Sequence, residues 1–218
     1  GYRFVDHRRY LDAWFDAVVG DEPVFLVIHD WGSGLGFHWA HRHPDQVRGI
    51  AYMEAIVRPL ASWDDWAEDA RKIFRAMRSP AGEEIILQKN VFIERILPSS
   101  IMRPLSDEEM GRYRARYTEP GESRRPTLTW PRQIPIGGEP EDVHEIADAY
   151  SSWLTASKTL PKLFVNAEPG SILIGPQREF ARGLPNQEEI NVKGLHFIQE
   201  DSPKEIGEAV ARFVQKNS

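Results

Sequence analysis

The residues Val24-Phe25-Leu26-Val27-Ile28-His29-Asp30-Trp31-Gly32-Ser33-Gly34 decide the fold class. The run 24–28 is apolar without alternation, which is typical of a strand covered on both faces. Gly32 and Gly34 allow a sharp turn into a helix over 34–42. Outward from this stretch, an amphipathic helix over 7–19 is expected to lie on the sheet, and a second buried strand follows over 47–53. This alternation of helices and strands predicts a parallel α/β sheet.

The segment 57–136 has a different pattern. Its helical stretches begin at Ser62, Ser79 and Ser106, and it contains no convincing buried strand. An all-helical insertion between two strands of a parallel sheet is typical of a lid, so we expect a cap here. Within it, the prolines of the tract 125–135 predict a stiff loop, because proline removes a backbone donor and fixes the backbone.

The sheet pattern resumes after the cap. Helices are predicted over 143–154 and 176–182, strands over 162–166 and 188–192, and a last helix from Ser202. The expected organisation is therefore a sheet core in two pieces, residues 1–56 and 137–218, with a helical cap over 57–136.

Composition excludes several classes. The 218 residues are 41% hydrophobic with a formal charge of −6, which offers no basic face for nucleic acid. The absence of cysteine excludes disulfides and thiolate metal sites, and no apolar window is long enough for a membrane span. We expect a soluble protein, with the cytoplasm as its default location and no cofactor. His38, His41 and His43 are expected to be solvent-facing residues and not metal ligands.

Chemistry is concentrated at the ends of three predicted strands. The turn at Asp30 resembles the nucleophile elbow of α/β-hydrolases, Gly-x-Ser-x-Gly, with aspartate at the central position and Ile28 in place of the leading glycine. Glu54 ends the next strand and His196 follows the last one, in the hydrolase order of nucleophile, acid and base. Ser33 lies inside the turn, where we expect it to cap the following helix.

A carboxylate at an elbow favours displacement at saturated carbon. Asp30 is ionised at neutral pH, so it can displace a leaving group and form an alkyl ester without losing a proton first. His196, oriented by Glu54, would activate water to hydrolyse that ester, and elbow N–H groups would stabilise the oxyanion. The indole N–H of Trp31 could hold a departing halide.

Four stretches, 29–33, 49–56, 124–135 and 196–203, resemble haloalkane dehalogenases of the branch whose acid follows the sixth strand. The resemblance implies an α/β-hydrolase with Asp30 as nucleophile, Glu54 as acid, His196 as base and Trp31 as one halide donor. It implies a haloalkane substrate, water and a halide product. The implied pocket wall consists of Phe92, Trp130, Pro131, Ile134, Ile172 and Phe197. Glu168 stands where other branches keep their acid and ranks second to Glu54.

The family begins with further strands and a loop that supplies a second halide-binding residue, an asparagine. These are missing from this chain. Without them the strand 24–28 would be an exposed apolar edge, which a soluble protein rarely tolerates. We expect the missing N-terminal segment, or another copy, to cover it.

Three other interpretations stay open. Residues 2–7 and 61–66 resemble Renilla-type luciferases, so light-producing oxidation of coelenterazine, or a bifunctional ancestor-like enzyme, is the alternative. Epoxide hydrolases share the elbow and use cap tyrosines, for which Tyr113 and Tyr117 are the candidates. A non-catalytic fragment that needs a complementing polypeptide is the alternative of another class.

Overall fold

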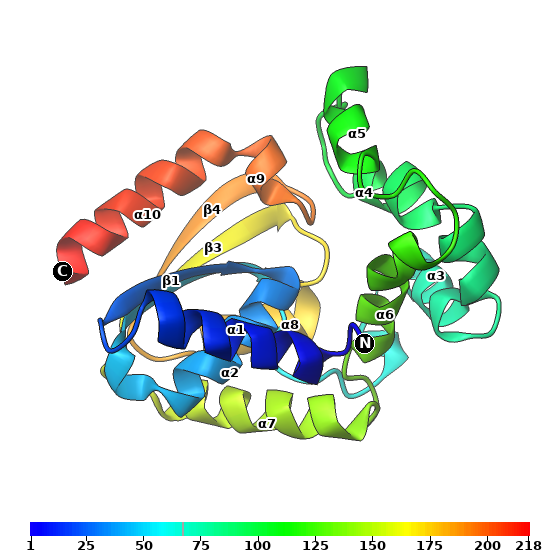
Figure 1. Ribbon diagram of the computed structural model, residues 1–218. Helices are drawn as coiled ribbons and strands as arrows, with labels where there is room; N and C mark the ends of the chain where they lie inside the picture. Colours follow the sequence, from blue (N-terminus) through cyan, green and yellow to red (C-terminus); the bar gives the residue numbers. More distant parts are fainter. Residues whose placement is uncertain (67) are drawn as a thin grey trace.

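A single parallel sheet organises the chain. The computed structural model describes residues 1–66 and 68–218. The strands β1 (Val24–His29), β2 (Val47–Ala55), β3 (Lys162–Pro169) and β4 (Gln187–Gly194) are parallel and lie in the order β1-β2-β3-β4. Figure 1 shows the segment with α3 to α6 beside this sheet. The predicted strand-containing core is confirmed, with each strand one to three residues longer than expected at one or both ends.

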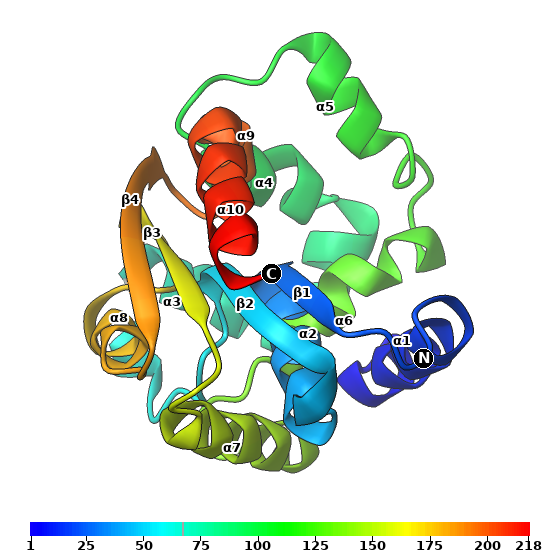
Figure 2. The same ribbon diagram turned by 90° about the vertical axis from the view of Figure 1, so that its left-hand side faces the viewer.

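Helices cover both faces of the sheet. One face packs on α2 (Asp30–Arg42), α7 (Glu141–Ala156) and α8 (Gly175–Arg182), and the other on α10 (Pro203–Asn217), which follows α9 (Ile198–Asp201) (Figure 2). Strand alternation produces this division: Leu26 and Ile28 face the first group, whereas Phe25 contacts Phe213 of α10. None of the helices in the described part of the chain has the length and apolar character needed to cross a membrane.

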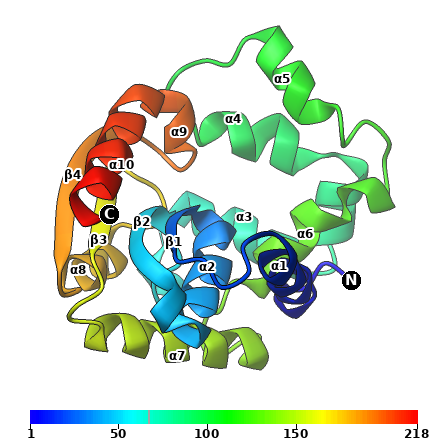
Figure 3. The same cartoon turned by 60° about the vertical axis from the view of Figure 1, so that its left-hand side comes forward.

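The first helix, α1 (Phe4–Val18), packs on α2 (Figure 3). Phe15 stacks on Trp39 of α2 with ring centroids 4.1 Å apart. The neighbouring part of the apolar stripe is exposed, with Tyr10 at 69%, Trp14 at 51% and Val18 at 64%. The helix prediction is confirmed, but the expected packing of its whole apolar stripe on the sheet was wrong.

Strand β1 lies at the edge of the sheet. Among the described strands it pairs with β2 alone, and Val27 is 52% exposed. Because α10 covers Phe25 but leaves Val27 on the same face exposed, the expected cover on both faces is only partly confirmed, whereas the expected open edge is confirmed.

The described part of segment 57–136 is helical. Its elements are η2 (Trp63–Asp65), α3 (Glu68–Arg78), η3 (Glu83–Gln88), η4 (Phe92–Ile96), α4 (Leu97–Ser99), α5 (Asp107–Arg114), η5 (Glu122–Arg124) and α6 (Arg125–Gln133). Helix α6 contradicts the predicted stiff loop. Pro126 occupies its first turn, where no backbone N–H is needed, and Leu128 is fully buried, so packing stabilises a helix that tolerates Pro131.

Candidate active site

Asp30 lies at the sharp turn between β1 and α2. It is the first residue of α2 and has a φ of 46°, the left-handed region. The turn was predicted, but its physical basis differs from the prediction: the positive φ belongs to Asp30, and Gly36 makes the close helix–strand approach. A Cβ on Gly36 would lie 2.8 Å from Ile28. Because the helix starts at Asp30, the side chain of Asp30 is fixed to a rigid element.

Ser33 ties this turn to the end of β2. Its buried hydroxyl donates to the carbonyl of Asp30 and accepts the N–H of Ile56 at 2.9 Å. The expected helix-capping role of Ser33 was wrong, because the helix has already begun three residues earlier. The hydroxyl has both of its partners in the backbone.

The structure brings Asp30, His196 and Glu54 into one line. His196 Nε2 lies 3.4 Å from Asp30 Oδ1, and His196 Nδ1 lies 3.3 Å from Glu54 Oε2. Asp30 follows β1, His196 follows β4 and Glu54 is the penultimate residue of β2. The carboxyl ends of the parallel strands therefore bring the three side chains together. The histidine therefore has a carboxylate on each ring nitrogen.

Glu54 is 1% exposed and is held by backbone donors. Its Oε2 accepts the N–H groups of Ser171 at 3.1 Å and Ile172 at 2.8 Å. Gly170 makes room for it, since a Cβ there would lie 3.0 Å from Glu54 Oε1. The competing acid, Glu168, is exposed, so the geometry favours Glu54 as the partner of His196.

The charges in this line stabilise one another. Burial lowers the pKa of His196, but the carboxylates of Asp30 and Glu54 outweigh burial and raise it to about 9. Burial likewise opposes ionisation of Asp30, yet His196 and the backbone N–H of Trp31 keep the pKa of Asp30 below its usual range. At neutral pH the free site therefore contains an ionised Asp30 and a protonated His196.

A first prediction concerns this ion pair. Asp30→Asn removes the carboxylate that makes the largest contribution to raising the pKa of His196, so that pKa should fall from about 9 by about 1–3 pH units. Histidine ring NMR across pH 5–10 measures the change. Glu168→Gln is the control and should leave the titration unaltered; an unchanged pKa in Asp30→Asn would contradict the assigned pairing.

His29 is a residue of this site that sequence reasoning missed. Its ring Nε2 lies 2.8 Å from the carbonyl oxygen of His196. Burial and the nearby His196 lower the pKa of His29, so it is neutral and can donate this hydrogen bond. Its position directly before Asp30 was a signal, but its long-range partner was not visible in the sequence.

A cavity of about 410 Å³ opens above Asp30 and His196. The predicted wall residues all line it: Phe92, Trp130, Pro131, Ile134, Ile172 and Phe197. Trp31 lines it beside Asp30 and lies 4.6 Å from Trp130, centroid to centroid. The cavity is thus formed by the strand ends below and the helices of segment 57–136 above.

The prediction missed several wall residues in segment 57–136. They are Leu60, Trp66, Ala70, Phe74, Ile93, Ile96, Leu97, Tyr113 and Tyr117. Their apolar spacing was a signal for a buried helix face, not for a cavity. Tyr113 donates its hydroxyl to Glu200 at 2.5 Å, so this hydroxyl is not free to protonate an epoxide.

His38 contradicts the expected solvent-facing histidines. It is 7% exposed, and its ring lies 5.9 Å from that of Phe4. Burial and the nearby Arg42 lower its pKa to about 4, so it is neutral. Packing of α1 on α2 covers it, a tertiary contact that the local pattern did not indicate.

Comparisons with known proteins agree with this geometry. The family model of the alpha/beta hydrolase fold matches residues 1–80. A haloalkane dehalogenase of Sphingobium indicum is 56% identical over 99% of this chain and 72% of its own length. A coelenterazine h 2-monooxygenase of Renilla reniformis is 42% identical over 99% of this chain and 69% of its own length. A crystal structure of an ancestral haloalkane dehalogenase superposes with a TM-score of 0.92 at 48% identity, covering 99% of this chain and 75% of the other.

Proposed function

This chain belongs to the haloalkane dehalogenase family of α/β-hydrolases, which makes it a hydrolase acting on carbon–halide bonds, and we propose that it acts through a covalent ester on Asp30. The observation that carries the proposal is the line of Asp30, His196 and Glu54 beneath the cavity. Halide release from 1-bromobutane tests the function. A folded protein that releases no halide would contradict it.

In the first step, Asp30 Oδ attacks the carbon that carries the halogen. A C–O bond forms, the carbon–halogen bond breaks, and the halide leaves with the electron pair. The low pKa of Asp30 supports this role, because the nucleophile is ionised without any proton transfer. Forming the ester removes the negative charge of Asp30.

The second step follows from that loss of charge. His196 then lacks one of the two carboxylates that raise its pKa, so it releases its proton to solvent and becomes a base at neutral pH. It takes a proton from water, and the oxygen of that water attacks the carboxyl carbon of the ester. Glu54 stabilises the imidazolium, and the N–H of Trp31 supports the oxyanion. The C–O bond to the ester carbonyl carbon breaks, and the alkoxide leaves with the remaining proton of the attacking oxygen, so the alcohol, the carboxylate of Asp30 and the protonated His196 are formed.

We assign the leaving halide to the indole N–H of Trp31. A donor beside the reacting carbon in an apolar cavity stabilises a developing anion, so Trp31→Phe should lower kcat/KM for halide release by about 10²-fold. It should also raise the inhibition constant of bromide. Trp63→Phe is the control, because Trp63 does not line the cavity. Equal bromide inhibition in Trp31→Phe and wild type would refute the assignment.

Oxidation of coelenterazine is the second candidate function. The similarity to the Renilla monooxygenase and the size of the cavity support it. Parallel assays of bromide release and of light emission with coelenterazine separate the two activities, and a bifunctional protein would give both signals.

We infer that additional polypeptide covers β1 in the functional protein. The exposed Val27 at this edge and the exposed stripe on α1 support cover by an N-terminal segment or a second copy. We also propose that residues 1–56 and 137–218 form the sheet core and that residues 57–136 form the helical cap.

Native mass and turnover measured together test the inference that additional polypeptide covers β1. A stable monomer of 218 residues that releases halide would contradict it, and would equally exclude a non-catalytic fragment.

A further inference from the structure

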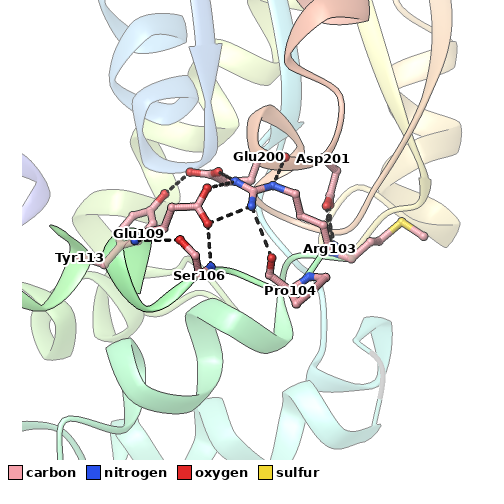
Figure 4. A network of polar contacts seen from close by, with 8 residues as sticks. Arg103, Pro104, Ser106, Glu109, Tyr113, Glu200 and Asp201 are labelled. Atoms are coloured by element: carbon pink, nitrogen blue, oxygen red, sulfur yellow. Dashed lines mark hydrogen bonds and ion pairs between the residues drawn. The ribbon is translucent and has the colours of Figure 1, made fainter. Parts of the chain in front are cut away.

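A polar cluster links the cap to residues 195–201, which comprise His196 and α9 and which we call the His196 loop (Figure 4). We call Arg103, Glu109, Tyr113 and Glu200 the Arg103 cluster. The guanidinium of Arg103 donates to Glu109 at 2.7 and 3.1 Å and to the carboxylate of Glu200 at 2.5 Å. Its Nε also donates to the carbonyl of Glu200 at 2.7 Å. The second carboxylate oxygen of Glu200 accepts the hydroxyl of Tyr113.

The loop that carries His196 is bound to the cap at further points. The carbonyl of Ser100 accepts the N–H groups of His196 and Phe197, both at 3.1 Å. Asp201 accepts the backbone N–H groups of Met102 and Arg103 at 3.0 Å. The position of the catalytic histidine therefore depends on cap residues far away in the sequence.

Tyr113 connects the same cluster to the cavity. Its side chain lines the cavity with Phe197, and both pack in one apolar cluster around Leu97. Glu200 holds the hydroxyl end of Tyr113. One carboxylate thus fixes a wall of the pocket and the loop after His196 at the same time.

The cluster is more than an isolated surface ion pair. A single exposed ion pair contributes little to stability, because solvent screens the attraction and ordering the two side chains costs conformational entropy. Here Glu109 is already fixed by the capping box of α5, since it accepts the N–H of Ser106 at 2.7 Å. The contact with Arg103 is bidentate, and Glu200 is only 23% exposed. A preorganised network of this kind can hold one geometry.

We propose that Glu200 is a positioning residue that couples the Tyr113 wall of the pocket to the loop of His196, and so sets both the size of substrate accepted and the rate of ester hydrolysis. The proposal rests on the proposed function. It assigns Tyr113 to substrate-size selection, and Arg103 to holding Glu200 in place.

The test compares Glu200→Gln with a matched control, Glu94→Gln. Glu94 forms an ion pair with Arg114 at 2.8 Å, is 37% exposed against 23% for Glu200, and has no hydrogen bond to the His196 loop. Glu200→Gln should slow ester hydrolysis in rapid-quench experiments by roughly three- to tenfold while the first halide burst stays near the wild-type rate. It should also shift the ratio of kcat/KM for bromocyclohexane over 1-bromobutane several-fold. Glu94→Gln should change neither quantity.

Two further measurements keep the inference testable. Tyr113→Phe keeps the ring and should alter the ratio of kcat/KM for bromocyclohexane over 1-bromobutane, but not the rate of ester hydrolysis. Amide hydrogen exchange at His196 and Phe197 does not require activity, and should accelerate roughly tenfold in Glu200→Gln and not in Glu94→Gln. If wild type releases no halide, the proposed function fails and hydrogen exchange alone decides the coupling. The inference would be overturned if Glu200→Gln showed the same amide exchange rate, the same rate of ester hydrolysis and the same ratio of kcat/KM for the two substrates as wild type.

Discussion

Replacing Asp30 with asparagine should reduce steady-state halide release by roughly 10⁴-fold or more, the loss expected when the group that forms the covalent intermediate is removed. The amide is neutral and cannot displace a halide from saturated carbon. Halide release from 1-bromobutane measures the effect, and circular dichroism verifies folding.

Two variants serve as controls for this result. Asp30→Ala should be equally inactive and cannot regain a carboxylate by deamidation. Glu168→Gln removes an exposed acid and should retain wild-type activity. Turnover by Asp30→Asn whose mass shows no deamidation would refute the assignment of Asp30.

Replacing His196 with phenylalanine should stop the reaction after one turnover. Asp30 still carries a carboxylate, so the alkylation step should proceed, but no base remains to activate water. One equivalent of halide should appear per protein, and the intact mass should increase by the butyl group minus a proton. Steady-state release should fall by roughly 10⁴-fold or more.

The control for this burst is His41→Phe. His41 is another partly buried histidine, but its ring lies against Trp153 of α7 and it does not line the cavity. This variant should turn over continuously. Continuous turnover by His196→Phe, or a stable protein mass after halide release, would show that His196 is not the base for ester hydrolysis.

The line of Asp30, Glu54 and His196 was predictable because its signals are local. Asp30 and Glu54 stand at the ends of apolar strands, His196 follows the last strand, and parallel strands end at one edge of a sheet. The resemblance to a family supplied the wall residues on the cap. Neither the strand-end pattern nor the family resemblance required knowledge of contacts between distant segments.

The features that were missed depend on tertiary packing. Helix α6 forms although Pro131 lies inside it, because Leu128 is buried against neighbouring cap helices. His38 is buried because α1 lies on α2. The Arg103 cluster joins residues that are 97 positions apart, so no local pattern indicated it.

A single-turnover reaction in H₂¹⁸O, with protein in excess over 1-bromobutane, tests the covalent ester most directly. Attack of water on the carboxyl carbon of the ester should leave ¹⁸O in the peptide that contains Asp30 and ordinary oxygen in the butanol. Butanol that carries ¹⁸O, together with an unlabelled Asp30 peptide, would mean that water displaces the halide directly and would contradict the account.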